Sequence, residues 1–325
     1  METVMRHPVT ISLIAPVYRV EKYIGRFAES VFSQSYPHIQ FIFVNDGTDD
    51  SSMDILESVI QDRYSHLKDR ITIVNQPHSG LPVARETGIR YASGDYIWLV
   101  DSDDWLETDA VVKIASKAEE SGSDLIYFNF IQDYSDRFKI KKERHYDIGN
   151  KGEYIRNIFN QKSFPCVWNK CVRRSVYDRH EIYFAGYSYS EDAYLMTQLI
   201  SYSESIAYLD AELYHYRKDN GSSLSHQKRK VRRLEYSLNF LDLYEKFRYD
   251  TSADNPVSLI VDMIVFRAGW HSMIYNLGLF AKFPYLAQMI SKAELNFRTK
   301  IGLFPQIMTK MYSSCRCLMD KRKKV

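Results

Sequence analysis

The sequence predicts an α/β fold with a mostly parallel sheet flanked by helices, followed by a helical extension. Over the first 130 residues, short apolar runs alternate with segments whose apolar residues recur at helical spacing. The apolar runs are hydrophobic throughout, which is typical of strands buried on both faces of a parallel sheet. A chain of 325 residues is long enough for one large domain with an extension.

The elements follow one another in a regular order. Strands are expected at 10–18, 39–46, 70–76, 95–101 and 123–131. Helices are expected between them at 21–34, 52–64, 81–92 and 109–122. Residues 132–225 are mixed and include a basic loop at 137–145, whereas the pattern from about 227 to 313 is helical. We therefore expect one domain at 1–225 and a helical, basic region at 226–325.

Composition indicates a globular protein outside the membrane. Hydrophobic residues make up 45% of the chain, charged residues make up 26%, and the mean hydropathy is -0.37. The sequence has no run of about 18 apolar residues and no signal-like apolar stretch at its start. Its four cysteines lack the paired C-x2-C spacing of a zinc site. We expect a reduced protein on the cytoplasmic side.

Charge is distributed unevenly along the chain. Residues 281–325 contain ten basic and two acidic residues, whereas residues 1–280 contain 33 basic and 39 acidic residues. Because apolar residues lie among the lysines of 282–324, this segment is a candidate for peripheral contact with the inner face of a membrane. A packed helical hairpin with solvated lysines is the alternative. We expect no nucleic-acid partner, since the basic residues belong to no recognisable binding module.

Polar residues occur where the predicted strands end. Pro16 and Tyr18 follow the first strand, Asp46 follows the second, and Asp101 and Asp103 follow the fourth. Parallel strands bring their carboxyl ends to one edge of a sheet, where ligands bind in such folds. We expect these residues to converge there.

The stretch "WLVDSDDWLE" (98–107) places three aspartates directly after a buried strand. Alternate carboxylates on such a turn can hold a hard divalent cation that also binds diphosphate oxygens. A solvated loop with a helix-capping aspartate is the other interpretation. The fully apolar strand before the turn favours the metal.

A second acidic stretch, "DGTDDSSMDILE" (46–57), has EF-hand spacing. Its sixth position is Ser51, where the calcium loop needs glycine, and a strand precedes it instead of a helix. We reject calcium here and expect Asp49 or Ser51 to cap the following helix.

Six stretches together resemble the family 2 glycosyltransferases, which have the GT-A fold. They cover roughly 15–225 and appear in the family's order. They are "APVYRVEKYI" (15–24), "FIFVNDGTDDSS" (41–52), "SGLPVARETGIRYASGDYIWLVDSDDWLE" (79–107), "VWNKCVRRSV" (167–176), "SEDAYL" (190–195) and "YHYRKDNGSS" (214–223). The resemblance implies a donor half at about 1–105 and an acceptor half at about 106–225.

The resemblance implies transfer of a sugar, usually with inversion, from a nucleoside diphosphate donor to an acceptor hydroxyl. A divalent metal, Mn²⁺ or Mg²⁺, would stabilise the leaving diphosphate. Asp103 would ligate the metal together with Asp101, and Asp104 would orient its neighbours. The donor-side residues implied are Pro16, Val17, Tyr18, Asp46, Arg85, Asp101, Ser102 and Arg217. The chain departs from the family at Glu86, where an asparagine is usual.

The acceptor hydroxyl needs a general base. The resemblance assigns this role to Asp192, with Glu191 as the runner-up, although acidic residues also favour helix N-termini for electrostatic reasons. Trp168 and Lys170 are implied on the acceptor side. His215 is offered as a further metal ligand, but a lone histidine near a strand end is more often structural.

The sequence thus predicts a metal-dependent inverting glycosyltransferase that takes a nucleotide sugar, with UDP favoured by the family's habit, and builds a surface polysaccharide or glycan. The acceptor would be a glycan or a lipid-linked molecule. A catalytically inactive module that binds sugar nucleotides or glycans is the alternative. A nucleotidyltransferase is less favoured, because "APVYRVEKY" offers no Gly-rich phosphate loop.

Overall fold

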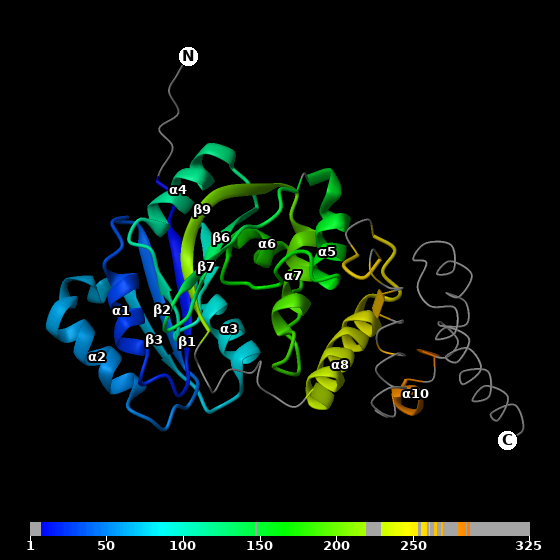
Figure 1. The fold of residues 1–325 in the computed structure, drawn as a ribbon, viewed down its shortest axis with the longest axis horizontal. Helices are drawn as coiled ribbons and strands as arrows, with labels where there is room; N and C mark the ends of the chain where they lie inside the picture. The colour runs from blue at the N-terminus through cyan, green and yellow to red at the C-terminus, as the bar shows by residue number, and fades with distance from the viewer. Residues whose placement is uncertain are drawn as a thin grey trace, which may run out of the picture. The chain divides into compact units, whose positions relative to one another are not determined.

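A computed structural model describes most of the chain (Figure 1). The described residues are 8–146, 148–218, 229–252, 255–258, 260, 263–264, 268, 279–283 and 285–286. The chain divides into two compact units, Met1–Ser223 and Leu224–Val325. In the second unit, the structure describes the helices α8 (Arg229–Phe247) and α10 (Leu279–Lys282). Most of the segment proposed for membrane contact, 282–324, lies outside the described residues, as do Cys315 and Cys317.

The first half of the sheet is parallel, as the apolar runs predict. Its strands lie in the order β3-β2-β1-β4, and each neighbouring pair is parallel. The elements are β1 (Ile11–Val17), α1 (Ile24–Phe32), β2 (Ile39–Asn45), α2 (Ser52–Arg63), the 3-10 helix η1 (Ser65–Arg70), β3 (Ile71–Asn75), α3 (Leu81–Arg90) and β4 (Tyr96–Leu99). All nine elements predicted up to residue 131 are present.

The second half of the sheet is mixed. The order continues as β8-β6-β9-β5; β8 is antiparallel to both β4 and β6, and β5 is antiparallel to β9. The elements are β5 (Trp105–Leu106), α4 (Ala110–Ser121), β6 (Leu125–Asp133), β7 (Phe138–Lys141), the 3-10 helix η2 (Ile148–Asn150), α5 (Lys151–Phe159), β8 (Lys170–Arg173), α6 (Arg174–Arg179), α7 (Glu191–Tyr202) and β9 (Ile206–Arg217).

The basic segment 137–145 was predicted as a loop, and this prediction is wrong in part. Residues 138–141 form β7, which pairs antiparallel with β6. Apolar and basic residues alternate here, which is the period of a strand. The dense positive charge hides that alternation in the sequence.

Helices cover both faces of the parallel half (Figure 1). Odd-numbered residues of β1, such as Leu13, join the hydrophobic core that also contains Phe27 of α1 and Ile114 of α4. Helix α3 packs on the opposite face, where Gly88 approaches Ile14 of β1. The sheet is therefore a buried central layer, which explains why its strands are apolar throughout.

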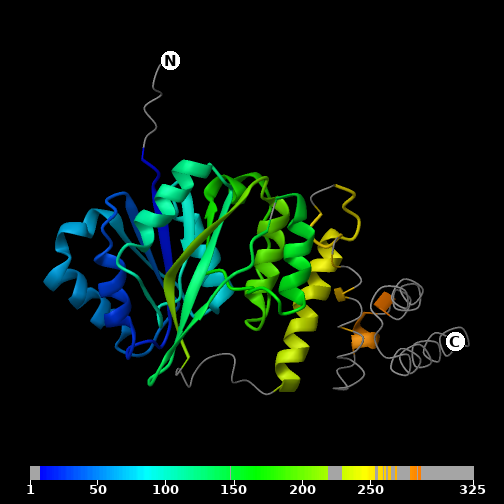
Figure 2. The ribbon, with the colours of Figure 1, turned by 45° about the horizontal axis from the view of Figure 1, so that its top comes forward.

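The strands place several loops at one edge of the sheet. Strands β1 to β4 all point the same way, and β6 points with them because two antiparallel steps through β8 separate β6 from β4. Figure 2 shows these strands from a second direction. The loops after β1, β2, β3, β4 and β6 therefore meet at the carboxyl edge, as the sequence predicts.

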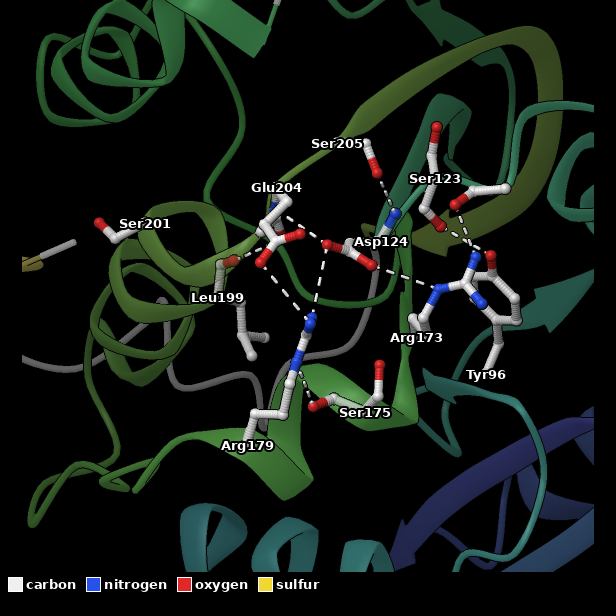
Figure 3. A network of polar contacts seen from close by, with 12 residues as sticks. Tyr96, Ser123, Asp124, Arg173, Ser175, Arg179, Leu199, Ser201, Glu204 and Ser205 are labelled. Atoms are coloured by element: carbon white, nitrogen blue, oxygen red, sulfur yellow. Dashed lines mark hydrogen bonds and ion pairs between the residues drawn. The ribbon is translucent and has the colours of Figure 1, made fainter. Parts of the chain in front are cut away.

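A polar network at the opposite edge anchors α7. Asp124, just before β6, accepts a hydrogen bond from the Glu204 backbone N–H at 2.9 Å, and its Oδ1 lies 3.2 Å from Arg173 Nε (Figure 3). Glu204 follows α7 by two residues. This network fixes the C-terminal end of α7, whose N-terminal end carries Glu191 and Asp192.

In the described part of the chain, no helix combines the length and the apolar character needed to cross a bilayer.

Candidate active site at the carboxyl edge of the sheet

A buried arginine brings together carboxylates from two distant parts of the chain. The side chain of Arg85 in α3 is 2% exposed, and its Nη2 donates to Asp101 Oδ1 at 2.8 Å. Its Nη1 donates to Asp192 Oδ1 at 2.6 Å and lies 3.4 Å from Glu191 Oε1. The guanidinium therefore joins the loop after β4 to the first turn of α7.

Negative charge exceeds positive charge in this cluster. Burial raises the pKa of Asp101 to about 6, and the charges of Asp192 and Asp103 add to the effect, although Arg85 opposes it. Burial and then the charge of Asp192 also raise the pKa of Glu191. One guanidinium does not balance these carboxylates, so the site favours a proton or a further cation.

The backbone before α7 is held in an unfavourable conformation. Ser190 has φ 68°, in the left-handed region that non-glycine residues rarely adopt. The two acidic residues follow it directly, and their side chains are 13% exposed for Glu191 and 19% for Asp192. Such strain occurs at functional sites, where the surrounding contacts maintain it.

The three aspartates after β4 differ in their surroundings. Each of Asp101, Asp103 and Asp104 offers a carboxylate oxygen within 4.8 Å of the others. Asp104 is buried, and its two oxygens accept from the Tyr214 hydroxyl at 2.8 Å and from the Arg217 backbone N–H at 2.7 Å. Asp104 therefore connects this loop to β9, and Asp101 and Asp103 are better placed to hold a metal.

Hard oxygen ligands of this kind suit Mn²⁺ or Mg²⁺. The excess negative charge around Asp101 is compatible with a divalent cation, so the residues fit the metal that the sequence predicts.

A second group of residues surrounds Asp46 in the loop after β2. Its carboxylate accepts from the backbone N–H groups of Ser79 and Gly80, each at 2.9 Å, and from Gln76 Nε2 at 2.7 Å. His78 Nδ1 lies 2.8 Å from Asp46 Oδ2. Asp46, which the resemblance implies on the donor side, thus also organises the loop between β3 and α3.

Tyr18 lies against this loop. Its ring stacks on the His78 ring with a centroid separation of 4.0 Å. Pro16 and Val17 are buried close by: the Pro16 carbonyl accepts from the Ser102 hydroxyl at 2.6 Å, and the Val17 carbonyl accepts from the Asp46 N–H at 3.1 Å. The structure therefore brings the predicted donor-side residues of β1, β2 and β4 together.

Sequence reasoning missed His78. The signal was present, because His78 follows the third predicted strand just as Asp46 follows the second. For α2, one of the two expected residues, Ser51, occupies the N-cap position, but its side chain makes no capping hydrogen bond. The Ser52 N–H donates to Asp50 Oδ1 at 3.1 Å, whereas Asp49 is occupied by Arg19 in two hydrogen bonds of 2.7 Å.

Basic and aromatic side chains lie beside the aspartate loop. Arg217 Nε donates to the Asp103 carbonyl at 3.1 Å, and its guanidinium lies 5.0 Å from the centre of the Trp105 ring. The guanidinium of Arg26, which the sequence analysis did not single out, lies 3.3 Å from the same ring. Burial and then the charge of Arg217 lower the pKa of Arg26. Two neighbouring cations that repel each other favour the binding of an anion.

Three other predicted residues have partners of their own. His215 Nε2 lies 2.6 Å from Glu107 Oε1, and the His215 ring stacks on Trp105. Trp168 is 3% exposed and stacks on Tyr214. Lys170 is buried and donates to the carbonyls of Phe164 and Cys166. Acceptor contacts by Trp168 or Lys170 would require these side chains to become accessible.

Glu86, which stands where the family usually has asparagine, is 42% exposed and pairs with Arg90 at 3.5 Å. The substitution therefore leaves the contacts of Arg85 in place.

Comparisons with known proteins agree with the family resemblance of the sequence. Residues 12–180 match the family described as glycosyl transferase family 2. The putative glycosyltransferase EpsH of Bacillus subtilis is 31% identical over 227 residues, which cover 68% of this chain and 64% of that protein. The chain thus spans just under two thirds of this relative.

Two solved structures share the fold. Residues 1–349 of Staphylococcus aureus TarS, in complex with UDP-GlcNAc, align with a TM-score of 0.62 at 18% identity, covering 88% of this chain and 80% of that one. The mannosyltransferase PcManGT of Pyrobaculum calidifontis, in complex with GDP-Man and Mn²⁺, aligns with a TM-score of 0.55 at 13% identity, covering 97% and 87%.

Proposed function

The chain belongs to glycosyl transferase family 2, and from this premise we propose that it is an inverting glycosyltransferase that uses a nucleoside diphosphate sugar. The observation that carries the proposal is the carboxylate cluster of Asp101, Glu191 and Asp192 around Arg85, with Asp103 beside it. We propose a UDP-sugar as the donor. The acceptor is a hydroxyl of a glycan or of a lipid-linked molecule in surface polysaccharide synthesis.

In this proposal two groups of residues bind different parts of the donor. The loops around Tyr18 and Asp46 bind the nucleoside, and the stacked rings of Tyr18 and His78 offer an aromatic surface to the base. Asp101 accepts from the ribose. Arg217, with Arg26 beside it, binds the diphosphate through charge-assisted hydrogen bonds.

Asp103 and Asp101 hold the divalent metal in this proposal. When bound, the metal neutralises the charge that develops on the departing diphosphate. Arg85 acts through the carboxylates that it contacts. Because its side chain is 2% exposed, it positions Asp101 and Asp192 for donor and acceptor.

Asp192 serves as the general base. Its carboxylate takes the proton of the acceptor hydroxyl while that oxygen attacks the anomeric carbon and the bond to the diphosphate breaks. Attack from the face opposite the leaving group inverts the anomeric configuration. Glu191 shares the first turn of α7 and is the alternative base, since its raised pKa makes it the better proton acceptor once ionised.

Substitution of the base tests this assignment. We expect Asp192→Asn to keep its affinity for the donor but to slow nucleoside diphosphate release in the presence of acceptor by about 10²-fold or more. The assay measures product release from a panel of nucleotide sugars with Mn²⁺. Asp178→Asn, which changes an exposed carboxylate paired with Arg174, serves as the control and should keep wild-type activity. Full activity of Asp192→Asn would place the base elsewhere, and Glu191→Gln would then be the next variant.

A further inference from the structure

The hairpin formed by β6 and β7 presents an unusual surface next to the candidate active site. Phe138 is 69% exposed and Ile140 is 46% exposed, although both lie on a strand of four residues. Among the described positions, none of the other exposed large hydrophobic residues lies on a strand: Val83, Tyr91, Tyr187, Val231 and Tyr249. An exposed apolar pair on one strand marks a surface for interaction.

The opposite side of the same strand is basic. Residues i and i+2 share one face of a strand, so Lys139 and Lys141 point away from Phe138 and Ile140. Lys218 follows β9, whose register with β6 brings it to the lysine face. Partial burial and then the charges of Lys139 and Lys218 lower the pKa of Lys141. These ammonium groups are therefore close enough to repel one another, and an anionic partner would relieve the repulsion.

The position of the hairpin relates this surface to the site. Strand β6 ends at Asp133, which pairs in register with Arg217 of β9 and with Phe138 of β7. Asp133 Oδ2 also lies 3.4 Å from His215 Nδ1. The hairpin thus extends from the carboxyl edge that carries the aspartate loop.

Protection of a sheet edge does not account for these residues. Among the strands that the structure describes, β7 pairs only with β6 and is therefore an edge strand, where lysines commonly prevent aggregation. That role explains Lys139 and Lys141. It does not explain Phe138 and Ile140, because exposed apolar side chains on an edge promote the association that the lysines oppose.

We propose that the β6–β7 hairpin docks on an anionic phospholipid bilayer. The hairpin meets the bilayer with the outer edge of β7, so that both faces of the strand touch it: Phe138 and Ile140 enter the boundary between head groups and acyl chains, and the long side chains of Lys139, Lys141 and Lys218 bend to the lipid phosphates. The hairpin then holds the catalytic edge of the sheet close to the membrane surface, where a lipid-linked acceptor would be presented. This membrane contact does not depend on the transferase activity.

Vesicle binding by the 325-residue chain tests the proposal. The vesicles contain equal parts of phosphatidylglycerol and phosphatidylcholine, and the ionic strength is physiological. We expect Phe138→Ser with Ile140→Ser, and separately Lys139→Gln with Lys141→Gln and Lys218→Gln, to lower the partition coefficient about 10-fold or more. Tyr91→Ser, and the triple change Lys68→Gln, Lys113→Gln and Lys117→Gln, are matched controls that should stay within about 2-fold of the wild type.

The vesicle-binding results of the variants decide whether the hairpin docks on a bilayer. Wild-type binding by both hairpin variants, or no binding by the wild type, would overturn the proposal. Loss of binding in the lysine variant alone would also overturn it, since the contact would then be electrostatic only and Phe138 and Ile140 would not enter the bilayer.

A local probe provides a second readout that is independent of other basic segments. Tryptophan emission of Phe138→Trp should be quenched by brominated phospholipid more strongly than that of the wild type. Tyr91→Trp carries its indole at the opposite edge of the sheet, near Gln40, and should behave like the wild type. Equal quenching in all three proteins would show that the hairpin stays out of the bilayer.

Discussion

At the scale of single residues, Arg85 determines how the candidate site is arranged. Its planar guanidinium presents separate nitrogens to Asp101 and to Asp192, which come from segments more than 90 residues apart in the sequence. A buried arginine that satisfies several carboxylates is costly to replace, because the partners are then left close together without a cation. The family resemblance implied a contact with the donor, whereas the structure gives Arg85 carboxylates as its partners.

Substitution of Arg85 by lysine should therefore be poorly tolerated. A single ammonium group cannot span Asp101 and Asp192 as the fork of arginine does. We expect Arg85→Lys to lower the free energy of unfolding by about 2–4 kcal/mol in urea titrations at neutral pH. Arg90→Lys on the same helix changes a side chain that is 63% exposed and should cost less than about 0.5 kcal/mol. Equal stability of the two variants would contradict the bridging role.

Asp101 should give the apo protein an unusual dependence on pH. Its pKa is about 6 in the folded chain and 3.8 as the ordinary value, so the folded chain retains a proton that the unfolded chain has lost. Its contribution to stability is therefore greatest below about pH 4 and is lost as the pH rises to about 6, by up to about 3 kcal/mol.

The difference between wild type and Asp101→Asn isolates this effect from other titrating groups. With chelator present, the substitution should stabilise the protein at pH 7 relative to its effect at pH 4. A constant difference between the two proteins across this range would contradict the assignment.

At the scale of elements, the placement of Arg85 depends on how closely α3 approaches the sheet. Gly88 lies one turn after Arg85, and a Cβ built there would overlap Cγ2 of Ile14 and lie 3.3 Å from Cγ2 of Val44. The motif "ARETG" thus combines the buried cation with the small residue that allows its helix to pack against β1 and β2.

Alanine at position 88 should move α3 away from the sheet. We expect Gly88→Ala to lower the free energy of unfolding by about 1–3 kcal/mol and to weaken nucleotide binding. Gly25→Ala in α1 is the matched control, since its Cβ would meet Ile55 at an ordinary 3.7 Å, and it should be neutral or slightly stabilising. Calorimetry on both variants checks the prediction, which fails if Gly88→Ala unfolds no earlier than Gly25→Ala.

Local patterns predict the elements better than they predict the contacts between them. The apolar runs and helical spacing of the first 131 residues predict nine of the elements there and miss only the 3-10 helix η1 and the two-residue strand β5, because each pattern is complete within about ten residues. The strands β5, β8 and β9 follow from pairing over longer distances, such as Trp105 with His215. The hydrogen bond from the Tyr214 hydroxyl to Asp104 depends on that pairing, so no local pattern indicates it.

At the scale of the whole molecule, the order of strands explains which parts of the site were accessible to sequence reasoning. Residues that follow parallel strands lie at one edge of the sheet, and this rule requires only that the strands be parallel. It correctly placed Asp46, Asp101 and Asp103 at one edge. The position of Asp192 beside Arg85 requires the path of the chain through β8 and α7; the family resemblance indicated Asp192 as a site residue, but nothing in the sequence indicated its contact with Arg85. The partners of Trp168 and Lys170 likewise depend on this mixed half of the sheet.

The central claim is that Asp101 and Asp103 form a metal-dependent site for a nucleoside diphosphate. The most direct test is thermal unfolding of wild type and Asp103→Asn with Mn²⁺ and a panel of nucleoside diphosphates, each at about 100 times its dissociation constant. We expect one diphosphate, UDP in our proposal, to stabilise the wild type by about 2.7 kcal/mol only when Mn²⁺ is present. Asp103→Asn should remain folded and lose this stabilisation. An equal shift in both proteins, or no shift with any diphosphate, would contradict the account.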